Sequence, residues 1–322
     1  MLKQDKAAWL LLPLLLAGCS GRQSALDPSG YEAEAVARLF WWMTAAGGVI
    51  WLLVVGLALY ATQRGGRPWP ARRAARLILA CGAVLPTLLL AVLLVFGLRM
   101  MPELRAPGEG LRIAVQGEQF WWRLRYELPD GRRFDTANDV RLPLGSRTEF
   151  LLTAQDVIHS FWIPALGGKM DLIPGTTNRL VLEPRRTGRF RGVCAEFCGA
   201  SHALMAFDVE VMEPVDFEAW AARQASAATP PMNDGAALFL ARGCGACHTV
   251  RGTEASGRIG PDLTHLGARP SIAAGILPNT AENIDRFIRH AREVKPAARM
   301  PSFDMLPAAE SAAIAAWLGS LR

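Results

Sequence analysis

The sequence CAEFCGASHALM, Cys194–Met205, places two thiols, one imidazole and one thioether within twelve residues. Soft ligands of this kind favour copper, zinc or iron–sulfur clusters over harder ions. A mononuclear blue-copper site uses one cysteine, two histidines and a weak methionine, so the second cysteine indicates a different centre. Two thiolates four residues apart on a loop can bridge two copper ions, and His202 and the upstream His159 can terminate one ion each. A structural zinc site and a Cys194–Cys198 disulfide are the alternatives that the same residues allow.

The segments around this stretch predict a β-sandwich over residues 110–215. Short alternating runs such as RTEFLLTAQDVIHSFWIP and AFDVEVMEP are punctuated by glycine and proline, which is typical of sandwich strands. Basic and acidic side chains are equal in number between Gly110 and Glu213. The net charge of +6 therefore lies elsewhere in the chain, and we expect no nucleic-acid partner.

The N-terminus predicts export from the cytoplasm. Two basic residues, Lys3 and Lys6, precede the apolar run AWLLLPLLLAGC. A short positive region followed by an apolar region predicts a signal peptide over residues 1–18. The ending LAGC resembles a bacterial lipobox, which implies that the thiol of Cys19 is lipidated and that this residue becomes the mature N-terminus. An ordinary signal peptide with an incidental cysteine is the alternative.

Residues 30–106 predict a transmembrane hairpin with helices at about residues 39–61 and 77–98. Both runs lack charged residues and have the roughly 20 apolar residues that a bilayer requires. Five arginines lie between the runs with no acid among them: Arg64, Arg67, Arg72, Arg73 and Arg76. Under the positive-inside rule this loop faces the cytoplasm, so both ends of the hairpin lie outside. We therefore expect a two-pass protein of a bacterial inner (plasma) membrane, in contact with lipid, whose later domains are periplasmic.

The last part of the chain predicts a separate helical domain that carries haem. A linker rich in Ala, Ser, Thr and Pro, residues 221–234, precedes an all-α domain over residues 235–322. The motif CGACH at Cys244–His248 is the attachment motif of c-type haem. Its thioether-forming residues are Cys244 and Cys247, and its iron ligand is His248.

The second axial ligand of the haem iron is expected to be a methionine. Met300, in ARMPSF just before the last predicted helix, resembles the methionine ligand of mono-haem cytochromes c, and Met305 is the competitor. The segment GPDL resembles the same family, which implies that the Pro261 carbonyl accepts the proton of the iron-binding imidazole. A plain turn residue is the alternative for this proline. The other two histidines of this domain, His265 and His290, are expected at the surface.

The hairpin and the sandwich together, about residues 30–215, resemble subunit 2 of the haem-copper cytochrome c oxidases. The segments HSFWIPALGGKMDLIPG and CAEFCGASHALM carry this resemblance. It implies a cupredoxin-like sandwich with a dinuclear CuA centre, in which two cysteines bridge the coppers and each histidine binds one. The implied ligands are the side chains of His159, Cys194, Cys198, His202 and Met205 and the main-chain carbonyl of Glu196. The Glu196 side chain is further implied in a magnesium site shared with the large subunit.

Two segments depart from the family pattern. The aromatic segment that receives electrons in the family is close to QWYW, whereas Gln119–Trp122 reads QFWW and places Phe120 at the first tryptophan position. Electrons then pass through Trp121 or Trp122, or directly from the haem, unless both tryptophans only pack against the sandwich. The second predicted membrane helix contains no carboxylate, whereas many members carry a glutamate there at the mouth of a proton channel.

With the haem domain included, the chain resembles subunit 2 of a caa-type oxidase. This resemblance implies that electrons pass from the covalent haem c to CuA and on to a partner subunit, which reduces oxygen to water with proton translocation. The expected partners are oxidase subunit 1 and the other oxidase subunits. The expected donor is a soluble or membrane-bound cytochrome c, or a quinol–cytochrome c reductase. The oxygen site is expected on the partner, because too few histidines remain in this chain.

Three other functions stay open from the sequence. The same chemistry occurs in a CuA-containing nitric oxide reductase subunit. A free-standing membrane-anchored electron carrier and a copper-handling lipoprotein belong to a different class. Purification in mild detergent discriminates among them, because an oxidase subunit brings a large haem-bearing, multi-helix partner with it.

Overall fold

The computed structural model describes residues 20–63, 69–108, 110–228 and 231–322. The predicted signal peptide, residues 1–18, and the predicted lipidation site Cys19 lie outside the described residues. The chain divides into two compact units, Ala35–Ala106 and the remainder, and each is described by itself.

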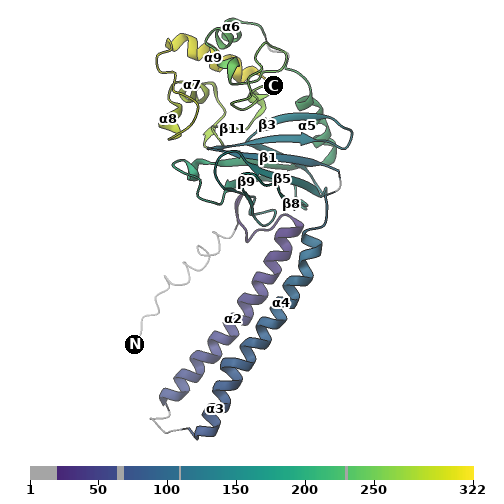
Figure 1. The fold of residues 1–322 in the computed structure, drawn as a ribbon, viewed down its shortest axis with the longest axis vertical. Coiled ribbons are helices and arrows are strands. Elements are labelled where there is room, and N and C mark those ends of the chain that lie inside the picture. Colours follow the sequence, from purple (N-terminus) through teal and green to yellow (C-terminus); the bar gives the residue numbers. More distant parts are fainter. Residues whose placement is uncertain (1–19, 64–68, 109, 229–230) are drawn as a thin grey trace, which may run out of the picture. The chain divides into compact units, whose positions relative to one another are not determined.

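The unit Ala35–Ala106 is a helical hairpin (Figure 1). Its elements are α2 (Tyr31–Gln63), α3 (Ala71–Leu79), the π-helical turn η2 (Ala80–Val84) and α4 (Leu85–Leu104). Two helices, α2 and the continuous α3–η2–α4, are long and apolar enough to cross a membrane, and their apolar stretches are not buried. Exposed apolar surface of this extent is typical of contact with lipid. The predicted spans, residues 39–61 and 77–98, lie inside helices that extend further at both ends.

The π-helical turn lies where a proline enters the second helix. Pro86 has no amide hydrogen, and its ring prevents the regular α-helical bond to the carbonyl four residues earlier. The amide of Leu85 donates instead to Ala80 O, five residues back. A single turn of this kind accommodates the proline without ending the helix.

The predicted β-sandwich is confirmed as two five-stranded sheets. The first sheet has the order β3 (Arg133–Ala137), β2 (Trp121–Glu127), β1 (Arg112–Glu118), β5 (Thr148–Ala154), β8 (Asn178–Leu182). The second has the order β4 (Asp139–Pro143), β10 (Ala206–Met212), β9 (Gly188–Cys194), β6 (His159–Trp162), β7 (Met170–Leu172). The pairs β1–β5 and β4–β10 are parallel, and the remaining pairs are antiparallel.

Aromatic side chains fill the space between the sheets. Trp122 is fully buried, and its ring lies 5.5 Å from that of Phe161 and 5.4 Å from that of Phe207, edge to face. The rings of Phe161 and Phe207 stack at 4.6 Å. These residues come from β2, β6 and β10, so one aromatic cluster joins both sheets beneath the ends of β6 and β9.

The first residues of the predicted linker 221–234, up to Ala225, are helical in the structure. The helix α5 (Pro214–Ala225) continues into it and packs on the sandwich. The Trp220 ring meets those of Tyr126 and Phe134 at 5.3 and 5.4 Å, edge to face. Buried residues recur along α5 at helical spacing: Phe217, Trp220, Ala221 and Gln224. The Ala, Ser and Pro content of the segment concealed this amphipathic pattern.

Helices are the main regular elements of the haem domain predicted from CGACH (Figure 1). Its helices are α6 (Asp234–Ala241), α7 (Ala281–Arg289), α8 (Ala291–Val294) and α9 (Ala308–Ser320). Short elements connect them: η4 (Cys244–Ala246), η5 (Leu266–Ala268), β11 (Ser271–Ile272) and β12 (Leu277–Pro278). Asn233 and Thr280 cap α6 and α7 through their side-chain oxygens. The α6–α9 contact requires Gly235, because a Cβ there would lie 2.3 Å from Ala313 O.

The close packing of β9 on β10 predicts that alanine is tolerated differently at two glycines, Gly192 in β9 and Gly168 outside the strand pair. A Cβ on Gly192 would lie 1.9 Å from the ring of Phe207, whereas a Cβ on Gly168 meets nothing within 4 Å. We expect Gly192→Ala to lower the free energy of unfolding by about 1–3 kcal/mol through overpacking, and Gly168→Ala to leave it nearly unchanged. Thermal unfolding of the full chain in detergent measures both. Equal melting temperatures for the two variants would contradict the packing described here.

Candidate metal and haem sites

The loop Cys194–Met205 connects two adjacent antiparallel strands, β9 and β10. The amide of Cys194 donates to Met205 O at 3.0 Å, so the two ends of the loop lie together. The sulfurs of Cys194 and Cys198 lie 3.9 Å apart, and the Met205 sulfur lies 3.8 Å from that of Cys198. All three side chains are buried.

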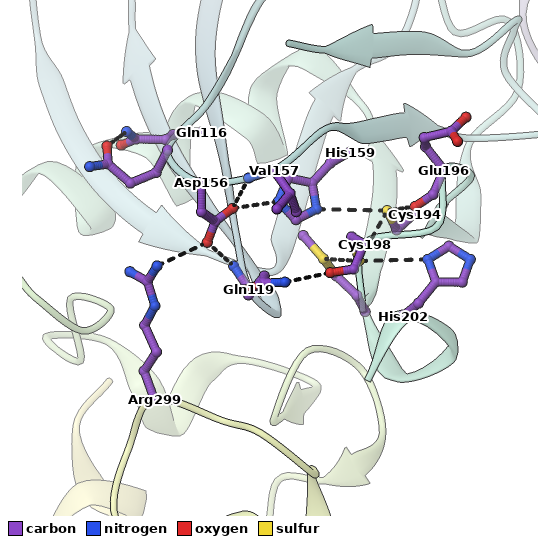
Figure 2. Close-up of polar contacts among 12 residues, drawn as sticks. Gln116, Gln119, Asp156, Val157, His159, Cys194, Glu196, Cys198, His202 and Arg299 are labelled. Atoms are coloured by element: carbon purple, nitrogen blue, oxygen red, sulfur yellow. Dashed lines mark hydrogen bonds and ion pairs between the residues drawn. The ribbon is translucent and has the colours of Figure 1, made fainter. Parts of the chain in front are cut away.

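One imidazole faces each thiol (Figure 2). His159 begins β6, which pairs with β9, and its Nδ1 lies 3.9 Å from Cys194 Sγ. His202 begins the 3₁₀ turn η3 (His202–Leu204), and its Nδ1 lies 3.6 Å from Cys198 Sγ. The carbonyl oxygen of Glu196 lies 3.2 Å from Cys194 Sγ. The structure thus brings together all the side chains and the carbonyl that the sequence predicted as copper ligands.

The donor atoms are close enough to share a metal. The ligand atoms of His159, Cys194 and Cys198 all lie within 4.8 Å of one another. The hydrogen bond between the two sulfurs lowers the pKa of Cys194, and the same contact, together with burial, raises the pKa of Cys198. A metal that binds both sulfurs displaces their protons, so its affinity depends on pH. Thiolate, imidazole and thioether donors together suit copper.

Asp156 fixes the orientation of His159. Its Oδ1 lies 2.9 Å from His159 Nε2, so this nitrogen carries the proton and Nδ1 presents a lone pair to the thiols. The same carboxylate accepts from the amides of Gln119 and Val157, each at 2.8 Å. Burial alone would raise the pKa of Asp156, but these hydrogen bonds outweigh it and lower the pKa. Sequence reasoning missed this residue, although it lies three positions before the histidine.

The two tryptophans of QFWW have different surroundings. Trp122 has no exposed surface and packs 6.0 Å from the His159 ring, so it is a core residue that cannot face a donor. Trp121 is partly exposed, and the Arg123 guanidinium lies 4.6 Å from its ring centre. Trp121 therefore remains the surface candidate for electron transfer. The Glu196 side chain is exposed, and its carboxylate points away from the thiols in Figure 2.

The haem-attachment motif forms a tight turn with both thiols accessible. Cys244 is half-buried at the start of η4, and Cys247 is exposed. The Nδ1 of His248 lies 2.9 Å from Pro261 O, so this nitrogen donates and Nε2 is left for a metal. Burial lowers the pKa of His248, which keeps the ring neutral, as a ligand must be. A Cβ on Gly260 would lie 2.5 Å from this ring, so the chain passes close behind it.

The two candidate methionines differ in burial. Met300 is partly buried and packs against the core of the haem domain, as do Phe303 and Leu306. Met305 is 73% exposed. The partly buried apolar side chains and the free thiols fit a flat, apolar group such as haem.

The surface placement predicted for His265 was wrong. The residue is 3% exposed, and its Nε2 lies 3.2 Å from Ser226 O. Burial lowers the pKa of His265, which favours the neutral ring. Ser226 is the residue that directly follows α5, so the end of this helix lies beside the imidazole. His290 is half-buried, and its Nδ1 lies 3.4 Å from a carboxylate oxygen of Glu293.

Comparison with known proteins identifies the family. The family model described as "Cytochrome C oxidase subunit II, periplasmic domain" matches residues 125–212, and the model "Cytochrome c" matches residues 232–322. Cytochrome c oxidase subunit 2 of Alkalihalophilus pseudofirmus is 34% identical over 97% of this chain and 95% of its own. This chain belongs to the cytochrome c oxidase subunit 2 family. The subunit 2 of Bacillus subtilis is 29% identical over 97% of this chain and 96% of its own.

The solved structure of the periplasmic domain of subunit II of cytochrome oxidase from Bradyrhizobium japonicum is also similar. It is 32% identical and covers 37% of this chain and 95% of its own, with a TM-score of 0.34.

Membership of the cytochrome c oxidase subunit 2 family has several direct consequences. The chain is part of an oxidoreductase complex, the haem-copper oxidase, and its family implies subunit 1 and other oxidase subunits as partners. The two matched domains imply copper and haem as cofactors. Two apolar helices and this family fit a two-pass membrane protein with a periplasmic domain.

Lys295 is a buried cation that the sequence did not reveal. It is 4% exposed, and its Nζ donates to Ala273 O at 3.0 Å. Burial lowers its pKa from 10.5 to about 7. A buried ammonium group is costly unless it is paired. Lys295 therefore reduces the stability of the folded chain at neutral pH.

We expect Lys295→Met to stabilise the chain most below pH 7, where the folded and unfolded states both carry the charge. Between pH 7 and 10.5 the folded wild type releases the proton and the unfolded chain keeps it, so wild-type stability rises with pH. The gain from methionine then shrinks by roughly 1.4 kcal/mol per pH unit. Melting temperatures at about pH 6 and pH 9 test this, with the exposed Lys169→Met as control. A gain that does not change with pH would contradict the assignment.

Proposed function

We propose that the buried thiol pair holds a dinuclear copper centre of the CuA type. The arrangement that carries this proposal is the pairing of thiols and imidazoles: Cys194 faces His159, and Cys198 faces His202. The two sulfurs lie 3.9 Å apart, and together with the two histidines they would hold the copper ions. Met205 lies beside the Cys198 sulfur and the Glu196 carbonyl beside the Cys194 sulfur, and both would complete the ligand set. Bound there, the copper pair supplies one-electron redox chemistry.

The second centre in this proposal is a covalent haem c. Cys244 and Cys247 would form the thioethers, and His248 would bind the iron through Nε2. Pro261 holds that ring by its Nδ1 proton. Met300 is the preferred second axial ligand because it is partly buried against the domain core, unlike Met305.

The chain then acts as the electron-accepting subunit of a respiratory cytochrome c oxidase. Electrons enter from a soluble or membrane-bound cytochrome c, or from a quinol–cytochrome c reductase, and pass from haem c to CuA and to subunit 1. That partner subunit reduces oxygen to water with proton translocation.

The proposed location is a bacterial inner membrane, with the arginine-rich loop in the cytoplasm and both redox domains in the periplasm. We also propose lipidation at Cys19 and a magnesium site that includes the Glu196 carboxylate.

Replacing one bridging thiol tests the copper centre. We expect two copper ions per wild-type chain, and loss of the near-infrared and EPR signals of the centre in Cys198→Ser. Haem c should be retained, because its ligands lie in the other domain. Cys81→Ser, an exposed cysteine of the hairpin, is the matched control. Metal analysis that finds one zinc and no copper in the wild type would refute the proposal.

The axial methionine is tested by two matched substitutions. Met300→Leu removes the sulfur ligand, and it should lower the haem midpoint potential by on the order of 100 mV, a fraction of the range of about 0.8 V that axial ligands span. Met305→Leu should leave the potential unchanged. Potentiometric titration of the haem absorbance measures both variants, and the copper spectrum should not move in either. The opposite pattern would assign the iron to Met305.

A further inference from the structure

Several contacts of the haem domain fall on residues that flank the candidate copper ligands. Ser201, which precedes His202, donates from its Oγ to Pro296 O at 2.6 Å. The amide of Ala206, which follows Met205, donates to Ala274 O at 3.2 Å. The segment around Pro296 also contains Met300, the preferred haem ligand. The two candidate sites are therefore connected by short contacts within the same compact unit.

A further contact, from Arg299 to Asp156, connects the haem domain to the candidate copper ligand His159 (Figure 2). Arg299 Nη2 donates to Asp156 Oδ2 at 3.1 Å, and the other oxygen of Asp156 lies 2.9 Å from His159 Nε2. Arg299 is the residue directly before Met300. A continuous series of covalent and hydrogen bonds therefore runs from the haem ligand through Arg299 and Asp156 to the copper ligand. Electronic coupling decays more slowly through such bonds than through a gap.

Asp156 is held in place by several hydrogen bonds, whereas Arg299 can be replaced without removing them. Asp156 is 11% exposed and is held by the amides of Gln119 and Val157, both on the sandwich. Arg299 is 54% exposed and reaches Asp156 from the haem domain. Removing the arginine thus leaves the carboxylate on His159 in place. An effect of such a change reports on the connection between the domains and not on the copper site itself.

We propose that Arg299, paired with Asp156, is a positioning residue that docks the haem domain on the copper site and completes the path for electrons between them. This proposal rests on the proposed function, which supplies the two redox centres. Because Arg299 is half exposed, the pair changes the equilibrium constant for docking by up to about fivefold. Its contribution is screened by salt, so the wild-type transfer rate should fall as ionic strength rises.

The test compares Arg299→Ala and Arg299→Lys with Arg292→Ala, another exposed arginine of the haem domain. The intact complex is photoreduced at the haem, and the rate of electron transfer to copper is followed optically. We expect Arg299→Ala to slow transfer by about threefold to fivefold and to lose most of the salt dependence. Arg299→Lys should recover part of the rate, and Arg292→Ala should match the wild type. The haem potential and the copper spectrum should be unchanged in all three.

A second readout does not depend on the metals. Hydrogen exchange of the Ala206 amide, which bonds to Ala274 O across the contact, reports docking in the full chain with or without copper. Protection of the Ala206 amide from exchange should fall in Arg299→Ala and stay at the wild-type level in Arg292→Ala. Wild-type rates and wild-type protection in Arg299→Ala would overturn the proposal, and so would lost protection with an unchanged rate. A wild-type chain that binds no copper would instead refute the proposed function, while the exchange experiment still decides whether Arg299 docks the domain.

Discussion

The backbone hydrogen bond from Cys194 N to Met205 O closes the loop that carries both thiols. The pairing of β9 with β10 continues directly from this bond, so the loop cannot open without breaking the second sheet. The pairing of β6 with β9 sets Phe161 opposite Cys194 and thereby places His159 beside the first thiol. Sheet register, and not loop sequence alone, determines which donor atoms meet.

The aromatic cluster beneath the site explains why this register is rigid. A one-residue shift of β9 or β10 would move every inward side chain to the outer face, and the ring of Phe207 fits against the bare backbone of Gly192. Similarly, Gly117 leaves room for His159, because a Cβ there would lie 2.8 Å from the imidazole. The two glycines and the rings of Trp122, Phe161 and Phe207 thus determine where the candidate ligands lie. Preorganised ligands reduce the rearrangement that a bound metal requires when its charge changes.

The sequence predicted those features that depend on local pattern or on specific chemistry. Apolar runs located both membrane helices, alternation located the sandwich, and CGACH located the haem domain. The features it missed depend on contacts between distant residues. Lys295 and His265 look like surface residues in the sequence but are buried in the fold, where they contact the carbonyls of Ala273 and Ser226. The buried face of α5, at Phe217, Trp220, Ala221 and Gln224, has helical spacing, but the linker-like composition around it hid this pattern.

The helix at the start of the predicted linker bears on how the fused haem domain is held. A flexible tether raises the effective concentration of one domain at another but does not select an orientation. Here α5 packs on the sandwich, and Arg251 of the haem domain donates to the carbonyls of Gln224 and Ala225 at its end. Ala228 N also donates to Arg251 O. The orientation of the haem domain therefore follows from these hydrogen bonds between Arg251 and the residues at and after the end of α5. The balanced charge of the sandwich is consistent with this arrangement, since a partner held by short contacts does not need a long-range field to find its site.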